Sequence, residues 1–336
     1  MTHSAAVAAI PELLKIFGSD WEDPKVEDVF VVRPGEFFVR RGGTTERRLA
    51  PAVDALSVEA IGALAGHLRG QYADEDKPIL DCELPSGERL NLVLHPCTPP
   101  GRPSLAIRRG MGDLVDLDWL DEQGLWDRIK KLSEEQATDH HAQRIAKAKS
   151  LIAERRVTDF FKYCVLNRWS IALTGETGSG KSLDLSAIVM EIPQTPEERI
   201  ITIGDSEELS KLPHPNKVSF LYADGGPVTA EDLIKASLRN LPRWQIVQEI
   251  RDKAAFAFLR SLIVSPALTT WHAMSIDSAF DAMLVMVMMH DSGKAIPVDM
   301  IRKMMATLIN VVVHVERDPV TKKFRATGIK FGSELL

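Results

Sequence analysis

The chain has 336 residues, of which 45% are hydrophobic and 26% are charged, as in ordinary globular proteins. This length is sufficient for two domains, each with its own core. The formal net charge of −6 does not favour a nucleic-acid-binding surface, which is normally basic, so we expect no direct specific binding of nucleic acid. The sequence shows neither a run of about 18 apolar residues nor a signal-peptide pattern, so we predict no membrane span and no secretion signal.

The chain contains three cysteines, Cys82, Cys97 and Cys164. Their odd number and wide spacing fit neither a disulfide framework nor a zinc site. We therefore expect buried, reduced thiols in a cytoplasmic protein. Peripheral association with a membrane machine is compatible with this expectation.

Residues 1–110 are predicted to form a small α+β N-terminal domain. Apolar residues at helical spacing predict helices over residues 7–18 and 55–69. Apolar runs bounded by turn residues predict strands over residues 26–33, 36–41, 79–83, 88–95 and 104–108. Residues 111–150 are polar and rich in acidic residues, with Trp119, Leu120, Leu125 and Trp126 as spaced apolar anchors, so we predict a linker with one or two short helices.

Residues 151–336 are predicted to form an α/β domain, which a helical stretch over residues 139–166 leads into. Strands are predicted at residues 171–173, 199–203, 218–221, 245–247 and 267–271, and helices at 229–240, 276–290 and 298–306, before a closing hairpin over 308–316 and 323–331. This alternation predicts a mostly parallel sheet covered by helices. The methionine-rich run 283–289 is predicted to pack in the core, with a partner-binding groove as the alternative.

The most specific motif follows the strand at 171–173 and matches the pattern G-x-x-x-x-G-K-[ST]. Its glycines let the backbone curl so that successive N–H groups point at phosphate oxygens, and the next helix adds its positive N-terminal end. We predict that Lys181 reaches the β- and γ-phosphates of ATP and that the Ser182 hydroxyl binds Mg²⁺. The predicted nucleotide-binding residues are Gly175, Glu176, Thr177, Gly178, Ser179, Gly180, Lys181, Ser182 and Leu183.

Three later strands of this domain end in polar residues. Asp205, Glu207 and Glu208 follow the first, Glu249 follows the second and His272 follows the third. Carboxylates at such strand ends, beside a phosphate loop, are suited to handling Mg²⁺ and the attacking water. Taken singly, each group has a structural alternative: loop carboxylates, a surface glutamate and a hydrogen-bonded core histidine. The predicted magnesium ligands are Ser182, Asp205 and Glu249.

The order of these motifs resembles that of the traffic ATPases of bacterial type IV secretion systems, within the type II/IV secretion and pilus-motor ATPase family. Residues 199–209 resemble the family's aspartate box, 237–252 its Walker B region, 269–273 its histidine box and 309–318 its closing strand. Residues 78–94 and 99–109 resemble the end of its N-terminal domain. The resemblance therefore covers most of the chain.

The resemblance implies a homo-hexameric ring of RecA-like motor domains, each preceded by an N-terminal domain and a flexible linker. It implies that ATP and Mg²⁺ bind at the domain interface, with His272 as a γ-phosphate sensor, and that N-terminal arginines complete the site. Such rings work at the cytoplasmic face of the inner membrane with inner-membrane secretion-channel components. The candidate catalytic residues are Lys181, Glu207, Glu208, Glu249, His272, Arg89 and Arg108.

The chain departs from the family pattern at several working positions. Gly204 stands where the family usually has a glutamate that prepares the attacking water, and Gln248 replaces a glycine before Glu249. Val264 belongs to a stretch that replaces the first part of the histidine box, and Asp184 lies in the first turn of the P-loop helix, where a second threonine is usual nearby. We expect these changes to weaken ATP hydrolysis more than nucleotide binding.

Several functions therefore stay open at this point. Either Glu207 or Glu208 replaces the missing glutamate in a working motor, or the chain is a ring subunit that binds nucleotide and barely hydrolyses it. A pilus assembly or retraction motor is a close alternative, although the four-cysteine zinc motif of the type II assembly branch is missing. The acidic composition disfavours a nucleic-acid translocase, and the lack of an acceptor-binding lid disfavours a small-molecule kinase.

Overall fold

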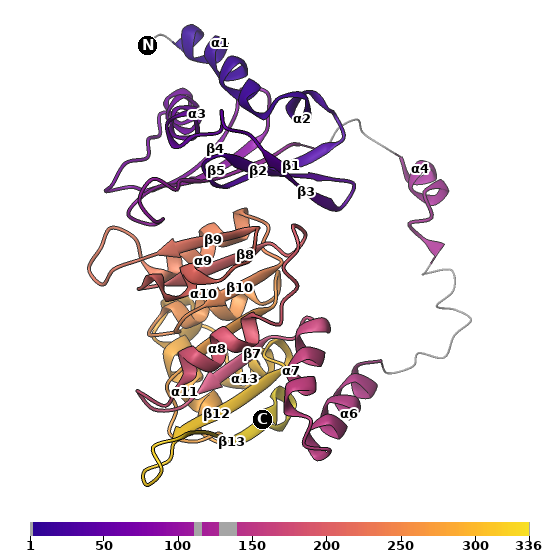
Figure 1. Cartoon of the computed structure of the whole chain (residues 1–336), viewed down its shortest axis with the longest axis vertical. Helices are drawn as coiled ribbons and strands as arrows, with labels where there is room; N and C mark the ends of the chain where they lie inside the picture. The colour runs from indigo at the N-terminus through magenta and orange to yellow at the C-terminus, as the bar shows by residue number, and fades with distance from the viewer. Residues whose placement is uncertain (1–2, 111–115, 128–139, 336) are drawn as a thin grey trace.

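The computed structural model describes residues 3–110, 116–127 and 140–335, and these contain two β-sheets. We call residues 3–110, which hold the first sheet, the N-terminal unit, and residues 140–335, which hold the second, the C-terminal unit. Figure 1 shows the first sheet beside the β9 end of the second, with α4 (Leu117–Glu122) away from both. The expected α/β fold is confirmed. Within these described ranges, no helix has both the length and the apolar character needed to cross a bilayer.

The first sheet has six antiparallel strands in the order β3-β2-β1-β6-β5-β4. One of its faces is covered by α1 (His3–Leu14) and α3 (Ala55–Leu68), whose Ile10 and Ile61 pack against strand residues such as Val29 and Leu92. Asp54 begins α3, because its carboxylate accepts a hydrogen bond from the Ser57 N–H (2.7 Å). The strands are β1 (Val26–Arg33), β2 (Glu36–Arg41), β3 (Thr44–Leu49), β4 (Ile79–Glu83), β5 (Arg89–Val93) and β6 (Ser104–Arg108).

Two features of the N-terminal unit differ from the sequence-based prediction. β3 was not predicted, because it is an edge strand in which Leu49 is the only apolar residue, so it lacks the apolar alternation of a half-buried strand. The predicted helix over residues 7–18 consists of α1 and a short 3-10 turn, η1 (Lys15–Phe17), and a further turn, α2 (Ser19–Glu22), follows it.

The second sheet has seven strands in the order β13-β12-β7-β11-β10-β8-β9. β13 runs antiparallel to β12, and the other neighbouring strands run parallel, as predicted. The strands are β7 (Ile171–Thr174), β8 (Ile200–Gly204), β9 (Lys217–Leu221), β10 (Trp244–Val247), β11 (Ala267–Trp271), β12 (Val311–Arg317) and β13 (Phe324–Phe331). The helical elements are α6 (His140–Ala153), α7 (Val157–Leu166), α8 (Lys181–Val189), η2 (Glu207–Lys211), α9 (Ala230–Arg239), α10 (Ala254–Ser261), α11 (Ala279–Met288), α12 (Asp291–Lys294), α13 (Val298–Leu308) and η3 (Gly332–Glu334).

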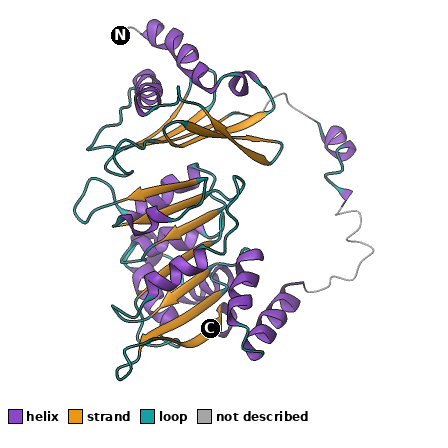
Figure 2. Ribbon diagram, viewed as in Figure 1, coloured by secondary structure: helices purple, strands orange, loops and turns teal. Residues whose placement is uncertain are grey.

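Helices cover both faces of the second sheet (Figure 2). α6, α7 and α8 pack on the face that carries Ile200 and Ile246, and α9, α10, α11 and α13 pack on the face that carries Ile201 and Val247. Successive strand residues therefore point to opposite helical layers, which explains the continuous apolar runs of this sheet. α10 was not predicted as a helix, because nearly all its side chains are buried and it has no polar face.

The methionine-rich run lies in α11 and only part of it is core. Met283 and Val287 are fully buried, as the core prediction requires. Val285 and Met289 on the other side of the helix are exposed. The prediction is therefore correct for one face of the helix.

The predicted helical stretch over residues 139–166 is interrupted. α6 ends at Ala153, and Arg155 adopts a left-handed backbone with φ of 60°, after which α7 begins at Val157. Ala148 and Leu151 of α6 share a core with Phe160 of α7. α6 thus packs on the rest of the C-terminal unit on both sides of residue 150, at which the linker was predicted to end.

The uncovered face of the first sheet packs on the β8–β9 side of the C-terminal unit. The guanidinium of Arg199 lies over the ring of Phe30, 4.1 Å from its centroid. The Nδ2 of Asn240 donates to Oδ1 of Asn91 (2.6 Å), and the Leu221 N–H donates to the Cys97 carbonyl (2.9 Å). Polar groups buried in this contact are thus hydrogen-bonded across it, which positions one unit on the other.

Candidate functional site

The P-loop connects the buried strand β7 to α8 by a tight backbone turn. Gly175 has a φ of 148°, and a β-carbon at this position would lie 2.1 Å from the Val315 carbonyl oxygen. Gly180 has a φ of 95° and begins α8, and a β-carbon there would meet the ring of Phe324 at 2.8 Å. Only glycine fits at these two positions, because both the backbone angle and the space exclude a side chain.

Lys181 folds back over the loop that precedes it. Its Nζ donates to the carbonyl oxygens of Gly175 (2.9 Å) and Glu176 (2.8 Å), and the residue is only 7% exposed. Burial lowers the pKa of the Lys181 ammonium below its usual value. Glu249 acts on this ammonium only through its charge, so a phosphate group beside the loop would supply the negative partner in direct contact that Lys181 lacks.

The first turn of α8 carries the next two predicted nucleotide-binding residues, Ser182 and Leu183, and both are exposed. Asp184 follows them and lines a cavity of about 280 Å³ together with Val315 and Phe324. Burial raises the pKa of Asp184 above its usual value. The acid noted in the sequence therefore faces this mostly apolar cavity beside the phosphate loop.

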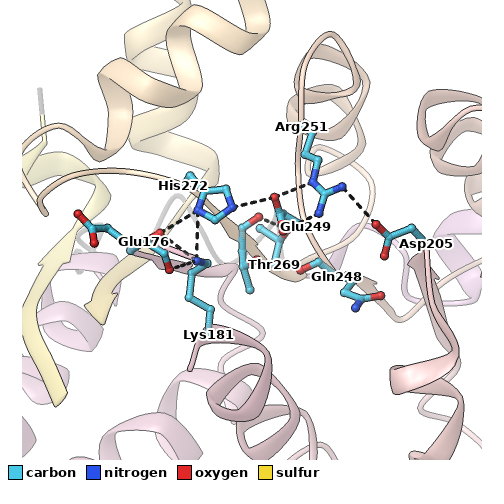
Figure 3. Close-up of polar contacts among 10 residues, drawn as sticks. Glu176, Lys181, Asp205, Gln248, Glu249, Arg251, Thr269 and His272 are labelled. Atoms are coloured by element: carbon cyan, nitrogen blue, oxygen red, sulfur yellow. Dashed lines mark hydrogen bonds and ion pairs between the residues drawn. The ribbon is translucent and has the colours of Figure 1, made fainter. Parts of the chain in front are cut away.

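A chain of polar contacts runs from the P-loop across the strand ends (Figure 3). The Nδ1–H of His272 donates to the Gly175 carbonyl (3.1 Å), and the Lys181 Nζ lies 3.4 Å from the same nitrogen. The Nε2 of His272 lies 3.2 Å from Oε1 of Glu249. Arg251 then binds Glu249, with its Nε 2.7 Å from Oε1, and Asp205, with its Nη1 3.2 Å from Oδ2. Residues that follow β7, β11, β10 and β8 are thus joined at the C-terminal ends of these parallel strands.

Arg251 stabilises the ionised form of Glu249 in this chain of contacts. Burial opposes ionisation of Glu249, but the hydrogen bonds and charge of Arg251 outweigh it, so the pKa of Glu249 lies below its usual value. The same hydrogen bonds raise the pKa of Arg251. A carboxylate stabilised in this way is a weak proton acceptor, and it is better suited to hold charge than to act as a base.

The aspartate-box carboxylates lie on the far side of this site from the P-loop. Glu207 and Glu208 begin η2, and both are exposed. The Nε2 of Gln248 donates to Oε2 of Glu208 (3.1 Å) and to the Ser206 hydroxyl (2.9 Å). The structure therefore links Glu208 to the end of β10 through Gln248.

The residues present fit a nucleotide that carries its own magnesium ion. The Ser179 hydroxyl is buried in the loop and has no hydrogen-bond partner, which leaves a donor available for a phosphate oxygen. Residues 3–110, 116–127 and 140–335 contain no cluster of three or more His, Cys, Asp or Glu side chains that could hold a metal ion. Mg²⁺ ordinarily uses one or two carboxylates together with phosphate oxygens and water, so such a cluster is not required.

Arg89 and Arg108 are not brought to the P-loop of the same chain. They line a cavity of about 560 Å³ with Arg239 and Leu241, at the C-terminal end of α9. This end of α9 leads into the N-terminal end of β10, whereas the P-loop follows the C-terminal end of the parallel strand β7. The two arginines therefore lie at the opposite edge of the second sheet from the P-loop.

Sequence reasoning did not include Arg251 or Gln248 among the site residues. Arg251 follows Glu249 by two residues, and that spacing beside a strand end is the signal for its role. Gln248 contacts Ser206 and Glu208, about 40 residues away, because β10 and β8 are neighbours in the sheet. That neighbour relation cannot be read from the order of strands in the chain.

Comparisons with known proteins give consistent results. A family model described as "Type II/IV secretion system protein" matches residues 135–327. The chain is 34% identical over 305 residues to Protein VirB11 of Agrobacterium fabrum, covering 88% of this chain and 86% of that protein. It is 29% identical over 305 residues to the type IV secretion system protein VirB11 of Brucella suis, covering 88% and 82%.

The fold is also similar to a solved structure. The crystal structure of the VirB11 ATPase from the Brucella suis type IV secretion system, in complex with sulphate, superimposes with a TM-score of 0.90. The two chains are 28% identical, and the match covers 99% of this chain and 97% of that one. The similarity thus extends over both units described above.

Proposed function

The chain belongs to the type II/IV secretion system protein family, and we propose that it is the ATP-hydrolysing motor of a type IV secretion system. Membership of this family makes the chain an ATPase. The observation that carries the proposal is the environment of Lys181, which is buried against the Gly175 and Glu176 carbonyls and close to His272. A buried ammonium without a carboxylate partner in direct contact, at the N-terminus of a helix, is a site for phosphate.

The P-loop binds the phosphates of ATP in this proposal. N–H groups of Gly175, Glu176, Thr177, Gly178, Ser179 and Gly180 surround the phosphates, with Lys181, Ser182 and Leu183 at the start of α8. On binding, the Lys181 ammonium exchanges its contacts with two loop carbonyls for contacts with the β- and γ-phosphates. His272, which shares the Gly175 carbonyl with this ammonium, moves with that exchange and so reports the presence of the γ-phosphate.

Ser182, Asp205 and Glu249 are the residues that we propose to hold Mg²⁺. When bound, this ion would neutralise negative charge that develops on the phosphate oxygens during hydrolysis. Arg251 orients Glu249 and Asp205, because it contacts both carboxylates. The lowered pKa of Glu249 favours this charge-holding role over that of the base, which leaves Glu207 and Glu208 as the candidate bases among the carboxylates.

We propose that the motor works as a homo-hexamer at the cytoplasmic face of the inner membrane, bound to inner-membrane components of the secretion channel. The position of Arg89 and Arg108 supports a ring, since they lie at the opposite sheet edge from their own P-loop and so serve the ATP of a neighbouring subunit. The corresponding division of the chain is an N-terminal domain over residues 1–110, a linker over 111–150 and a motor domain over 151–336. The contacts of Ala148 and Leu151 with the C-terminal core favour a motor domain that also includes α6.

A second candidate function is a ring subunit that binds nucleotide but barely hydrolyses it. Gly204 is the observation in its favour, because no carboxylate extends from the end of β8 at that position. A pilus assembly or retraction motor uses the same chemistry and is separated from a secretion motor by its cargo alone.

Steady-state ATP hydrolysis by the full chain with Mg²⁺ tests the proposal, with nucleotide binding and ring size measured on the same sample. We expect turnover that the Lys181→Ala variant abolishes, because that variant lacks the only lysine in the P-loop. Lys162→Ala, on the surface of α7, is the matched control and should leave turnover unchanged. Nucleotide binding without turnover would replace the motor by the ring-subunit function, and the absence of both would overturn the nucleotide site itself.

A further inference from the structure

Gly204 and Gln248 form a complementary pair at the ends of β8 and β10. A β-carbon on Gly204 would lie 2.2 Å from Oε1 of Gln248 and 3.2 Å from its β-carbon. Such a distance is far inside van der Waals contact, so any larger residue at position 204 displaces the carboxamide. Two of the positions at which the sequence departs from the family pattern are therefore in contact, and Gly204 leaves the space that the Gln248 side chain occupies.

The carboxamide of Gln248 is held in place from several sides. Its Nε2 donates to the Ser206 hydroxyl (2.9 Å) and to Oε2 of Glu208 (3.1 Å). Its main chain is fixed as well, since the Gln248 N–H donates to the Ile203 carbonyl (2.8 Å) and the Thr270 hydroxyl donates to the Gln248 carbonyl (2.9 Å). A polar group fixed in this way needs little reorganisation when it binds a ligand.

The carboxamide lies at the edge of the sheet where the phosphate loop lies. Gln248 directly follows β10, on the sheet face that Trp244 and Ile246 share with Leu185 of the P-loop helix. The next residue, Glu249, contacts His272, and His272 in turn contacts the Gly175 carbonyl of the P-loop. Figure 3 shows Gln248 on the Asp205 side of Glu249.

We propose that Gln248 orients the water that attacks the γ-phosphate, and that Gly204 is required because it leaves space for this carboxamide. The inference rests on the proposed ATPase function and names the residue that the function needs. Both N–H groups of this carboxamide already donate, to Ser206 and Glu208, and its Oε1 lies 3.2 Å from the Ser206 hydroxyl. The remaining lone pair of Oε1 can accept a hydrogen bond from a water molecule, without the carboxamide carrying a charge. A glutamine that orients the attacking water is an established solution in phosphoryl transfer.

With Gln248 in this role the hydrolytic step balances without a protein base, so this inference replaces the assignment of Glu207 or Glu208 as the base. The water oxygen forms a bond to the γ-phosphorus while the bond from that phosphorus to the bridging oxygen breaks, and its electron pair leaves on ADP. The water proton passes to an oxygen of the released phosphate, because a carboxamide does not accept it at neutral pH. The exposed Glu208 then serves to hold the Gln248 amide, which accounts for its contact with Nε2.

The test is a set of ATPase and nucleotide-affinity measurements on the full chain with Gln248→Ala, Gly204→Ala and the double variant. We expect Gln248→Ala to lower kcat about 100-fold while the affinity for ATP changes by less than about threefold. Gly204→Ala should lower kcat to a similar extent, because its methyl group displaces the carboxamide. The double variant should be no slower than Gln248→Ala, since the carboxamide is lost only once. Gln194→Ala, an exposed glutamine outside the site, is the control for the substitution itself.

Gln248→Glu gives a second readout that a purely structural role would not move. A carboxylate at this position introduces a further titrating group, so the dependence of kcat on pH should gain an additional acidic limb relative to the wild-type chain. A kcat for Gln248→Ala within twofold of wild type, additive losses in the double variant, or an unaltered pH profile for Gln248→Glu would each overturn the assignment. Wild-type turnover that depends on Lys181 keeps the proposed function intact in those cases, whereas its absence overturns the function and this inference together.

Discussion

Arg251 joins Glu249 to Asp205 across the ends of β10 and β8, through contacts of 2.7 Å and 3.2 Å. These are the two carboxylates proposed to hold Mg²⁺, so Arg251 sets their positions and separation. Arg251→Gln should lower ATP turnover about 10- to 100-fold and shift its Mg²⁺ dependence to higher concentrations. A Mg²⁺ titration of hydrolysis measures both effects, with Arg156→Gln on the α7 surface as the control. Unchanged Mg²⁺ dependence would show that the arginine does not act on the metal ligands.

The pKa of Lys181 predicts how ATP affinity depends on pH. Burial lowers the pKa of this lysine in the free protein, and a neighbouring phosphate raises it again. Between the two pKa values, binding must therefore take up a proton, and the affinity for ATP should fall as the pH rises through the lower one. Calorimetry in two buffers of different ionisation enthalpy measures this uptake. An arginine stays charged over this pH range, so the Lys181→Arg variant should bind ATP without proton uptake. Equal proton uptake by both proteins would contradict the attribution of this uptake to Lys181.

Asp184 predicts a pH-dependent gain in stability on substitution. Burial raises its pKa in the folded protein, so the folded state disfavours the ionised carboxylate and stability falls as the pH rises through the unfolded and then the folded pKa. Asp184→Asn should therefore raise the free energy of unfolding at pH 7 by no more than about 1 kcal/mol, because the half-buried carboxyl retains part of its hydration. The gain should disappear below both pKa values, where the aspartic acid is neutral in both states. Urea unfolding at pH 7 and at acidic pH measures it, and an equal gain at both would exclude a role for ionisation.

The contact between the two units can be weakened at a single hydrogen bond. Asn91 is 2% exposed and accepts a hydrogen bond from the fully buried Asn240. Asn91→Ala leaves the Asn240 amide without this partner, which should cost about 1–3 kcal/mol of stability. Equilibrium unfolding measures the loss, and a change below about 0.5 kcal/mol would indicate that water replaces the partner at once.

Cys97 gives a direct probe of the same contact. Its carbonyl accepts from the Leu221 N–H across the two units, and burial raises the pKa of its thiol to about 11. Alkylation of Cys97 at neutral pH should therefore be slow and should become faster in Asn91→Ala. Both proteins should carry Cys82→Ser, so that only the two buried thiols remain. Cys164, buried in the core of the C-terminal unit, is then the internal control and should stay unreactive in both proteins. Equal acceleration at both thiols would indicate global unfolding instead of separation of the units.

Most of the second sheet was predictable because its strands are buried on both faces and read as apolar runs. β3 and α10 were not predictable for opposite reasons, since Thr44–Leu49 is a polar edge strand and Ala254–Ser261 is apolar all round. Amphipathic periodicity requires one buried face and one exposed face, and neither segment has both.

The P-loop was predictable because its residues are contiguous and each has a local backbone role. The contact between Gly204 and Gln248 was not, because it depends on β8 and β10 being neighbours in the sheet although they are separated by β9 and α9 in the chain. The same limit applies to Arg89 and Arg108. The sequence predicts the strands that contain them, but it does not predict the part of the C-terminal unit that these strands face. Contiguous motifs can be predicted from the sequence, whereas contacts between side chains from distant segments depend on the order of the strands in the sheet.

The position of Arg89 and Arg108 at the sheet edge opposite to their own P-loop has a genetic consequence. If each ATP is bound by the P-loop of one chain and the arginines of another, a Lys181→Ala chain and an Arg89→Ala/Arg108→Ala chain carry different halves of the defect. Mixed rings of the two should then contain intact sites, about a quarter of the total for random assembly of equal amounts. Two inactive alleles expressed together would restore secretion. A chain with all three substitutions would instead inactivate both ATP sites to which it contributes in any ring that it joins.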